Sequence, residues 1–200
     1  MRKIVLLFPL LLPLASLFAQ TETDSLLLVL DQTLHNQKIY AKQKDDRINI
    51  LKQELAKQTT VEGKYQLNNR IIDEYKYYIS DSVMAYIDDN KVLADQVNNK
   101  SWQVENKLQY AYILSSVGIF NEAQRILESV TIAGLPDSLV LSYYKCYEEL
   151  YVHLLDFIDD PRFSQVYNKQ LILYRDSALR YLPPQSAEYL FWQFKSGFIK

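Results

Sequence analysis

The sequence predicts an all-α protein in which antiparallel helix pairs stack as a short solenoid. Internal repetition is the first observation behind this prediction, because it fixes an architecture before any residue is read for chemistry. The segments DSVMAYI (81–87) and DSALRYL (176–182) share an Asp-Ser start and a tyrosine one helical turn after the serine, and 122–127 is a looser copy. The chain also has only 4 glycines and 6 prolines among 200 residues, which disfavours a turn-rich β fold. Its 48% hydrophobic content is enough for one sizeable core.

In all three copies a small residue lies three positions after a large apolar or aromatic one. We expect the acidic residue to cap a helix, the small residue to let two helices approach closely, and a tyrosine to fill the gap one turn later. The small residues are Ser82, Ala123 and Ser177, the residues three before them are Ile79, Phe120 and Tyr174, and the tyrosines are Tyr86 and Tyr181. This interpretation explains the pattern without a ligand.

Residues 1–19 have the pattern of a secretory signal peptide. A basic start, Met1–Lys3, precedes an apolar stretch up to Phe18, and Ala19 and Gln20 provide the cleavage site. Prolines interrupt the apolar stretch, which is short for a membrane span of about 20 residues. An uncleaved signal anchor remains the alternative. We therefore expect an exported, periplasmic protein.

Charge and cysteine content narrow the function classes further. The net charge is -2, and removal of Arg2 and Lys3 with the signal peptide leaves 20 basic and 24 acidic residues, or -4. A mildly acidic exported chain is a poor nucleic-acid binder. Cys146 is the single cysteine, which excludes an intramolecular disulfide and indicates a small buried residue.

Residues 20–58 form a predicted N-terminal helical segment. Asp24 and Ser25 are candidate caps for a helix that begins at Leu26. The polar stretch 37–47 leaves open whether this segment is one long helix or two. Thr59 or Thr60 is expected to cap the following helix, whose first turn Gly63 weakens.

Residues 59–200 form the predicted helical repeats. Boundaries at caps, glycines and prolines predict helices over 64–79, 82–97, 101–118, 121–130, 139–157, 162–174 and 187–200, with Ser101 as one cap and a helix restart at Asp176. In the last helix we expect Tyr189, Leu190 and Phe194 to be buried. Its other apolar residues, Phe191, Trp192, Phe198 and Ile199, lack a partner helix. We therefore expect further repeats, a membrane helix or a homo-oligomer beyond residue 200.

The stretch from Val104 to Leu127 resembles a tetratricopeptide (TPR) repeat. Lys107 stands where such repeats carry tryptophan, and the glycine beside the small position of the first helix is missing. The matching positions are Ala111 in the first helix, the turn glycine Gly118, the aromatic Phe120, Ala123 in the second helix and Leu127 one turn later. The resemblance implies antiparallel helix pairs that Ala111 and Ala123 allow to pack closely.

The whole chain is also similar to the exported half of certain bacterial regulators. The signal peptide, the opening LDQTL and the segment YRDSALRYLPP carry this second resemblance. In those regulators, TPR-like repeats precede a membrane helix, a coiled coil and an intracellular helix-turn-helix. The resemblance implies a sensory role in signalling.

The sequence holds no catalytic constellation, and we expect a non-catalytic module without a cofactor or metal. His35 and His153 lack a ligand at helical metal-site spacing, and paired aspartates such as Asp159-Asp160 read as turns and caps. We expect a protein or peptide ligand in a concave groove lined by first helices, with Tyr110, Leu114, Tyr144 and Tyr151 as candidate core or groove residues. The alternative is a glycan-binding protein in which tyrosines and Trp102 or Trp192 stack on sugars.

Overall fold

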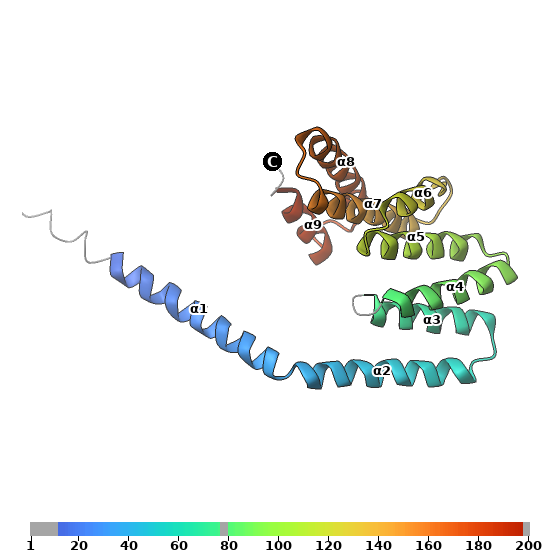
Figure 1. Ribbon diagram of the computed structural model, residues 1–200, viewed down its shortest axis with the longest axis horizontal. Helices are drawn as coiled ribbons and strands as arrows, with labels where there is room; N and C mark the ends of the chain where they lie inside the picture. Colours follow the sequence, from blue (N-terminus) through green and yellow to red (C-terminus); the bar gives the residue numbers. More distant parts are fainter. Residues whose placement is uncertain (1–11, 77–79, 198–200) are drawn as a thin grey trace, which may run out of the picture. The chain divides into compact units, whose positions relative to one another are not determined.

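The computed structural model describes residues 12–76 and 80–197, and every regular element in these residues is an α-helix (Figure 1). The helices are α1 (Leu12–His35), α2 (Gln37–Lys57), α3 (Val61–Tyr75), α4 (Ser80–Gln96), α5 (Lys100–Ser116), α6 (Phe120–Glu128), α7 (Asp137–Phe157), α8 (Pro161–Leu179) and α9 (Ala187–Gly197). Neighbouring helices pack in pairs. The predicted all-α solenoid of helix pairs is therefore confirmed.

The chain divides into two compact units, residues 1–50 and 51–200. The first unit contains α1 and most of α2, which are separated at Asn36. The backbone amides of Ile39 and Tyr40 both donate to the Asn36 carbonyl, at 2.9 and 3.1 Å, and so start a new helix. The segment is thus two helices. The expected start at Leu26 is wrong, because α1 already begins at Leu12 and runs through Asp24 and Ser25.

In the second unit, three helix pairs follow one another: α3 with α4, α5 with α6, and α7 with α8. Successive pairs meet through α4 and α5 and then through α5, α6 and α7, while α9 lies against α8. Figure 1 shows this succession in green to red. The first helices of the pairs are also linked by side chains, since the rings of Tyr65 on α3 and Trp102 on α5 stack 4.0 Å apart.

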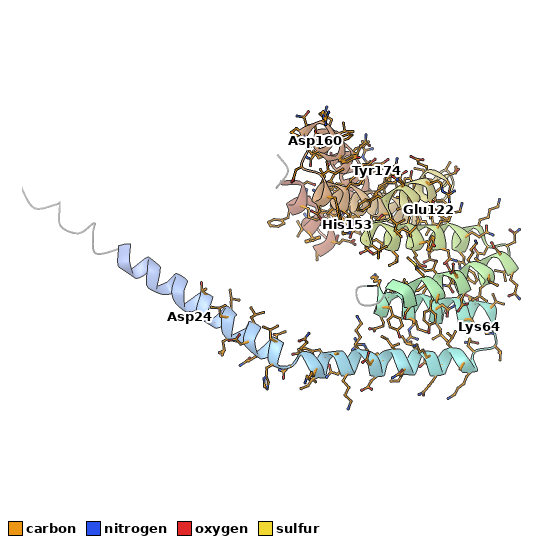
Figure 2. All side chains as sticks on the ribbon, in the orientation of Figure 1. Asp24, Lys64, Glu122, His153, Asp160 and Tyr174 are labelled. Carbon is orange, nitrogen blue, oxygen red and sulfur yellow. The ribbon has the colours of Figure 1, made fainter. Side chains whose placement is uncertain are left out.

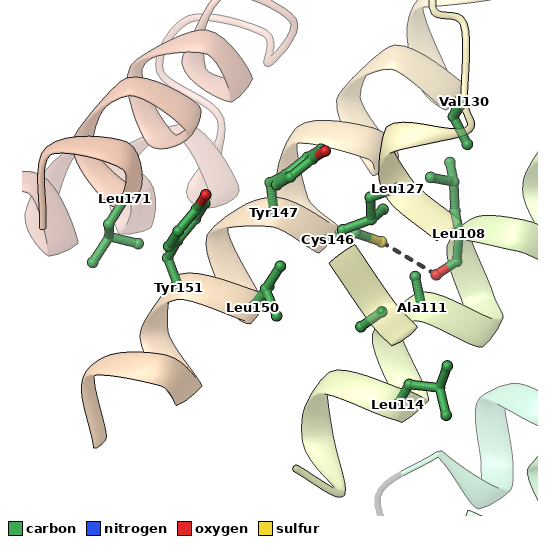
Figure 3. Packing of buried hydrophobic residues seen from close by; sticks show 11 residues of the cluster. Leu108, Ala111, Leu114, Leu127, Val130, Cys146, Tyr147, Leu150, Tyr151 and Leu171 are labelled. Carbon is green, nitrogen blue, oxygen red and sulfur yellow. Dashed lines mark hydrogen bonds between the residues drawn. The ribbon is translucent and has the colours of Figure 1, made fainter. Parts of the chain in front are cut away.

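The main core lies between α5, α6, α7 and α8 (Figure 3). Small residues allow the helices of this core to pack closely. Ala111 and Ala123 are both completely buried, and they leave room for the branched side chains of Leu127 and Leu150. The thiol of Cys146 donates to the Leu108 carbonyl across the core at 3.4 Å. A second, smaller cluster of Ala178, Leu182 and Trp192 holds α9.

Side-chain caps fix several helix starts where the sequence indicated them. Thr60 caps α3 by accepting from the Gly63 amide at 3.2 Å, Asp160 caps α8, and Ser186 accepts from the Tyr189 amide at 3.1 Å. Gly63 does more than weaken the first turn, because a Cβ there would lie 2.8 Å from the Thr60 hydroxyl and also meet the side chain of Gln58. The glycine therefore makes room for the cap.

Several expected helix starts differ from the structure. Asn99, not Ser101, caps α5 by accepting from the Trp102 amide at 3.2 Å. Helix α4 begins at Ser80, so Asp81 is a helical residue rather than a cap, and α6 begins at Phe120. Helix α8 continues without a restart through Asp176 to Leu179. Inside a helix, a serine hydroxyl can donate a hydrogen bond to a carbonyl one turn back, as Ser177 does to Leu173. The Asp-Ser pair at 176–177 is therefore compatible with a helix interior.

The expected burial in the last helix is also wrong. Trp192 is buried, whereas Leu190 and Phe194 are exposed and Tyr189 is half-buried. Helix α9 therefore presents a different face to the cluster of Ala178 and Leu182 than the sequence indicated, with the indole of Trp192 packed against these residues. Phe198 and Ile199 lie outside the described residues.

Candidate ligand-binding groove

A cleft of about 500 Å³ runs across the first helices of the three pairs and ends at α9. Helices α3, α5, α7 and α9 all contribute side chains to it. The charged residues that line it are Asp73, Lys76, Glu105, Lys145, Glu148, Glu149, Glu188 and Lys195, and the aromatic ones are Tyr112, Phe191 and Trp192. Five carboxylates face three amines, so the lining carries an acidic excess.

One wall of the groove is a single face of α9. Glu188, Phe191, Trp192 and Lys195 line the groove at helical spacings of three and four residues. Glu188 forms an ion pair with Lys145 of α7. The ammonium of Lys195 lies 5.4 Å from the centre of the Trp192 ring and 5.6 Å from that of Phe191. Phe191 itself is exposed, so it offers an apolar surface to a ligand.

A buried ion cluster fixes this wall from behind. Glu148 of α7 accepts a hydrogen bond from Arg175 Nη2 at 2.6 Å and forms an ion pair with Lys195, whose Nζ lies 2.8 Å away. The side chains of Glu148 and Arg175 are almost inaccessible to solvent. Arg175 Nη1 donates to the Lys195 carbonyl at 3.0 Å. The cluster therefore ties α9 to both helices of the last pair. A buried carboxylate with two cationic partners is far less costly than an unpaired charge.

Two carboxylates in the middle of the groove make a different kind of contact. Glu105 accepts from the Tyr65 phenol at 2.7 Å, and Oε1 of Glu149 lies 3.2 Å from Nε2 of His153. In the described part of the chain these contacts are with a phenol and an imidazole rather than with a lysine or arginine. Burial and the bond to Glu105 both raise the pKa of the Tyr65 phenol. Its proton therefore stays on the phenol and is donated to the carboxylate.

Gln109 adds an unsatisfied acceptor to the same groove. Its Nε2 donates to Asn69 at 3.1 Å, and Asn69 also accepts from Asn90 at 2.8 Å, so a chain of amides fixes the orientation of the glutamine. Its Oε1 is buried and makes no hydrogen bond in the described residues. A donor supplied by a ligand would satisfy this atom.

The chain was compared with known protein families, curated proteins and solved structures. The sequence profile of the SusR N-terminal TPR domain matches residues 34–197. The chain belongs to the SusR N-terminal TPR domain family. No curated protein and no solved structure shows a significant match. The match confirms a divergent TPR-like repeat protein that resembles SusR-type regulators, and it makes the chain a helical repeat module of the kind that mediates protein interactions.

The predicted packing residues of this SusR-type domain lie in two environments. Ala111, Ala123 and Leu127 are completely buried, Phe120 packs against them, and Gly118 adopts a φ of +84° in the turn. Ser82 and Ser177 are only half-buried, and the residues after them, Val83 and Ala178, occupy the fully buried positions. The repeated pattern therefore marks the helices correctly but is displaced by one residue in two of its three copies.

The tyrosine partners of these serines lie outside the main core. Tyr86 is half-buried beside Tyr75, with ring centres 6.3 Å apart. Tyr181 follows the end of α8, is exposed, and lies 5.8 Å from Tyr144. Both rings thus bridge neighbouring helices at the edge of the packing.

The structure separates the four candidate groove residues from the groove itself. Leu114 and Tyr151 are buried in the main core, Tyr110 packs against that core, and Tyr144 packs against the cluster around Trp192. None of the four is among the residues that line the cleft. Sequence reasoning missed the charged lining, although the i, i+3 and i+4 spacing of Lys145, Glu148 and Glu149 on α7 was a usable signal.

Tyrosines instead form a continuous cluster between α7 and α8. Figure 2 labels Tyr174 near its centre, where its ring stacks on Tyr147 at 4.2 Å and on Tyr151 at 5.7 Å. Burial raises the pKa of Tyr174 to about 12 and that of Tyr147 still further. These rings pack against one another and serve as helix contacts.

The tryptophans are likewise engaged in packing. Trp192 is buried, and one face of Trp102 is covered by Tyr65. Trp192 therefore offers no free indole face of the kind that the glycan-binding alternative requires.

Within 12–76 and 80–197, no three histidine, cysteine, aspartate or glutamate side chains gather closely enough to hold a metal ion. In the same ranges no helix combines the length and apolar composition needed to cross a bilayer. Ala19 and Gln20 lie within α1, and cleavage between them stays a prediction.

Proposed function

We propose that the groove binds a segment of a protein or peptide that carries a basic side chain next to an apolar one. The single observation behind this proposal is the groove lining, in which five carboxylates and an exposed phenylalanine are contributed by α3, α5, α7 and α9. A lysine or arginine of the ligand would pair with Glu105 and Glu149, and an apolar neighbour would cover Phe191. Extended ligands suit a groove that crosses several helices, since each repeat offers its own contacts.

We further propose that the domain is the exported, sensory part of a bacterial signalling protein, held in the periplasm and attached to the inner membrane. The signal-peptide pattern of residues 1–19 and membership of a family named for a SusR regulator support this role. The domain itself acts by binding and not by catalysis.

Selection from a phage-displayed library of random peptides tests the binding proposal. The protein should enrich peptides with a lysine or arginine near an aromatic or aliphatic residue. Ser142→Trp, which fills the groove, should abolish their binding, whereas Gln165→Trp on the exposed side of α8 should not. The double change Glu105→Gln and Glu149→Gln should remove the preference for basic peptides. Enriched peptides that bind Ser142→Trp as well as the unchanged protein would contradict the proposal.

Export is tested separately by sequencing the N-terminus of the protein recovered from the periplasm of a bacterial host. A chain that starts at Gln20 supports the proposal. A chain that stays in the cytoplasm with Met1 or its neighbour at the N-terminus would contradict it.

A further inference from the structure

The first unit of the chain presents a stripe of exposed apolar side chains. On α1, Leu26, Leu27, Leu30 and Leu34 fall within an arc of about 100° on one helix face. On α2, Ile39 and Tyr40 are exposed as well, and all six side chains are at least half exposed. Exposed apolar side chains that gather on one helix face mark interaction sites.

The charges beside this stripe differ between the two helices. Between residues 20 and 35 all charged side chains apart from the histidine are acidic, and Asp24 and Asp31 flank the leucines of α1. Between residues 36 and 44 all charged side chains are lysines, and Lys38 and Lys42 flank Ile39 of α2. The stripe thus has an acidic half followed by a basic half.

A surface with this order of charges is complementary to itself in the antiparallel direction. When two copies are related by a two-fold axis near residues 34–35, the acidic half of each α1 faces the basic start of the other α2. A two-fold interface repeats every such contact, so Asp31 of each copy meets Lys38 of the other. In a parallel arrangement the same halves would bring like charges together. Charge complementarity therefore favours a second copy of this chain, in antiparallel orientation, as the occupant.

We propose that the α1–α2 stripe is a homodimer interface in which two chains pair antiparallel through their leucines and opposite charges. Each half-exposed apolar side chain offers roughly 50 Å² of apolar surface, so twelve of them bury roughly 600 Å². This area is well below the roughly 1,200–2,000 Å² of stable specific complexes, so we expect a weak dimer that forms only at high protein concentration. The interface is separate from the groove, so the two proposals stand or fall independently.

Sedimentation equilibrium of the purified chain from about 1 to 200 μM tests the proposal. The mass should rise from one chain to two with concentration. Leu30→Asp should weaken the dimer about a hundredfold or more, because each dimer contains the contact twice. Val92→Asp, at an exposed valine of α4, is the matched control and should leave the dimer unchanged.

Charge exchange and crosslinking test the direction of pairing. Asp31→Lys and Lys38→Asp should each weaken the dimer, and the double variant should recover most of the loss, because its charges are again opposite. Chains with Leu26→Cys should form disulfides with Gln43→Cys chains but not with one another. A chain that is monomeric at all concentrations, a dimer that survives Leu30→Asp, or disulfides between two Leu26→Cys chains would overturn the proposal.

Discussion

Replacement of Glu148 by glutamine tests whether the buried ion cluster holds α9 against the last helix pair. The side chains of Glu148 and Arg175 are only 2% and 3% exposed, and the carboxylate accepts a hydrogen bond from Arg175 at 2.6 Å and forms an ion pair with Lys195 at 2.8 Å. Glutamine has nearly the same shape and can still accept one bond. The substitution leaves the cations of Arg175 and Lys195 together without a counter-charge, and Arg175 is buried.

The expected loss follows from the burial of Arg175. Removal of one partner from a buried ion pair costs about 3–5 kcal/mol, because the remaining charge is uncompensated. For a unit the size of residues 51–200, each kcal/mol lowers the midpoint of thermal unfolding by about 2–4 °C. Glu148→Gln should therefore lower the midpoint by roughly 6–20 °C.

Two measurements detect the loss of stability in Glu148→Gln. Far-ultraviolet circular dichroism gives the thermal midpoint, and amide hydrogen exchange of residues 187–197 reports the release of α9. The double variant Glu148→Leu with Arg175→Leu should recover most of the stability, since it removes both buried charges. Glu122→Gln, in an exposed ion pair on α6, should change nothing measurable. A loss below about 1 kcal/mol for Glu148→Gln would refute the reasoning.

Three further predictions concern the core and one turn. Ala123→Leu should destabilise the protein by about 1–3 kcal/mol in urea unfolding, because Ala123 is completely buried between helices; an unchanged midpoint would mean that the site has spare room. Gly118→Ala should cost about 1–2 kcal/mol, since φ is +84° there while no atom lies near the added Cβ; a stabilised variant would show that the turn can relax. Burial raises the pKa of the Cys146 thiol to about 12 from 9.0, so the thiol favours folding below pH 9 and this contribution is lost as the pH rises towards 12. Stability measured over that interval should therefore fall less steeply in Cys146→Ala, and a parallel decline in both proteins would contradict the assignment.

The helices were predictable because their ends are local. Thr60, Asp160 and Ser186 each accept a hydrogen bond from an amide two or three residues ahead, and such a contact depends on neighbouring residues only. The same dependence on neighbouring residues explains why the predicted helix restart at Asp176 is wrong. A serine inside a helix can satisfy its own hydroxyl on the preceding turn, so an Asp-Ser pair alone does not distinguish a helix start from a helix interior.

The groove was not predictable in the same way. Tyr151 and Phe191 are both aromatic residues on apolar helix faces, yet one is buried in the core and the other is exposed beside a cleft. Helical periodicity places a side chain on a face but does not say which neighbouring helix covers that face. The covering helix is decided by long-range contacts such as those of Arg175 with Glu148 and with the Lys195 carbonyl.

The sequence by itself determined the helical class, the pairing of helices, the caps at Thr60, Asp160 and Ser186 and the resemblance to the TPR family, because each of these depends on contacts within about 25 residues. Only the tertiary structure decided which residues line the groove. Glu105, Glu149 and Glu188 come from three different helices, and they meet in one groove because close packing around Ala111, Ala123 and Trp192 sets how the first helices and α9 lie together.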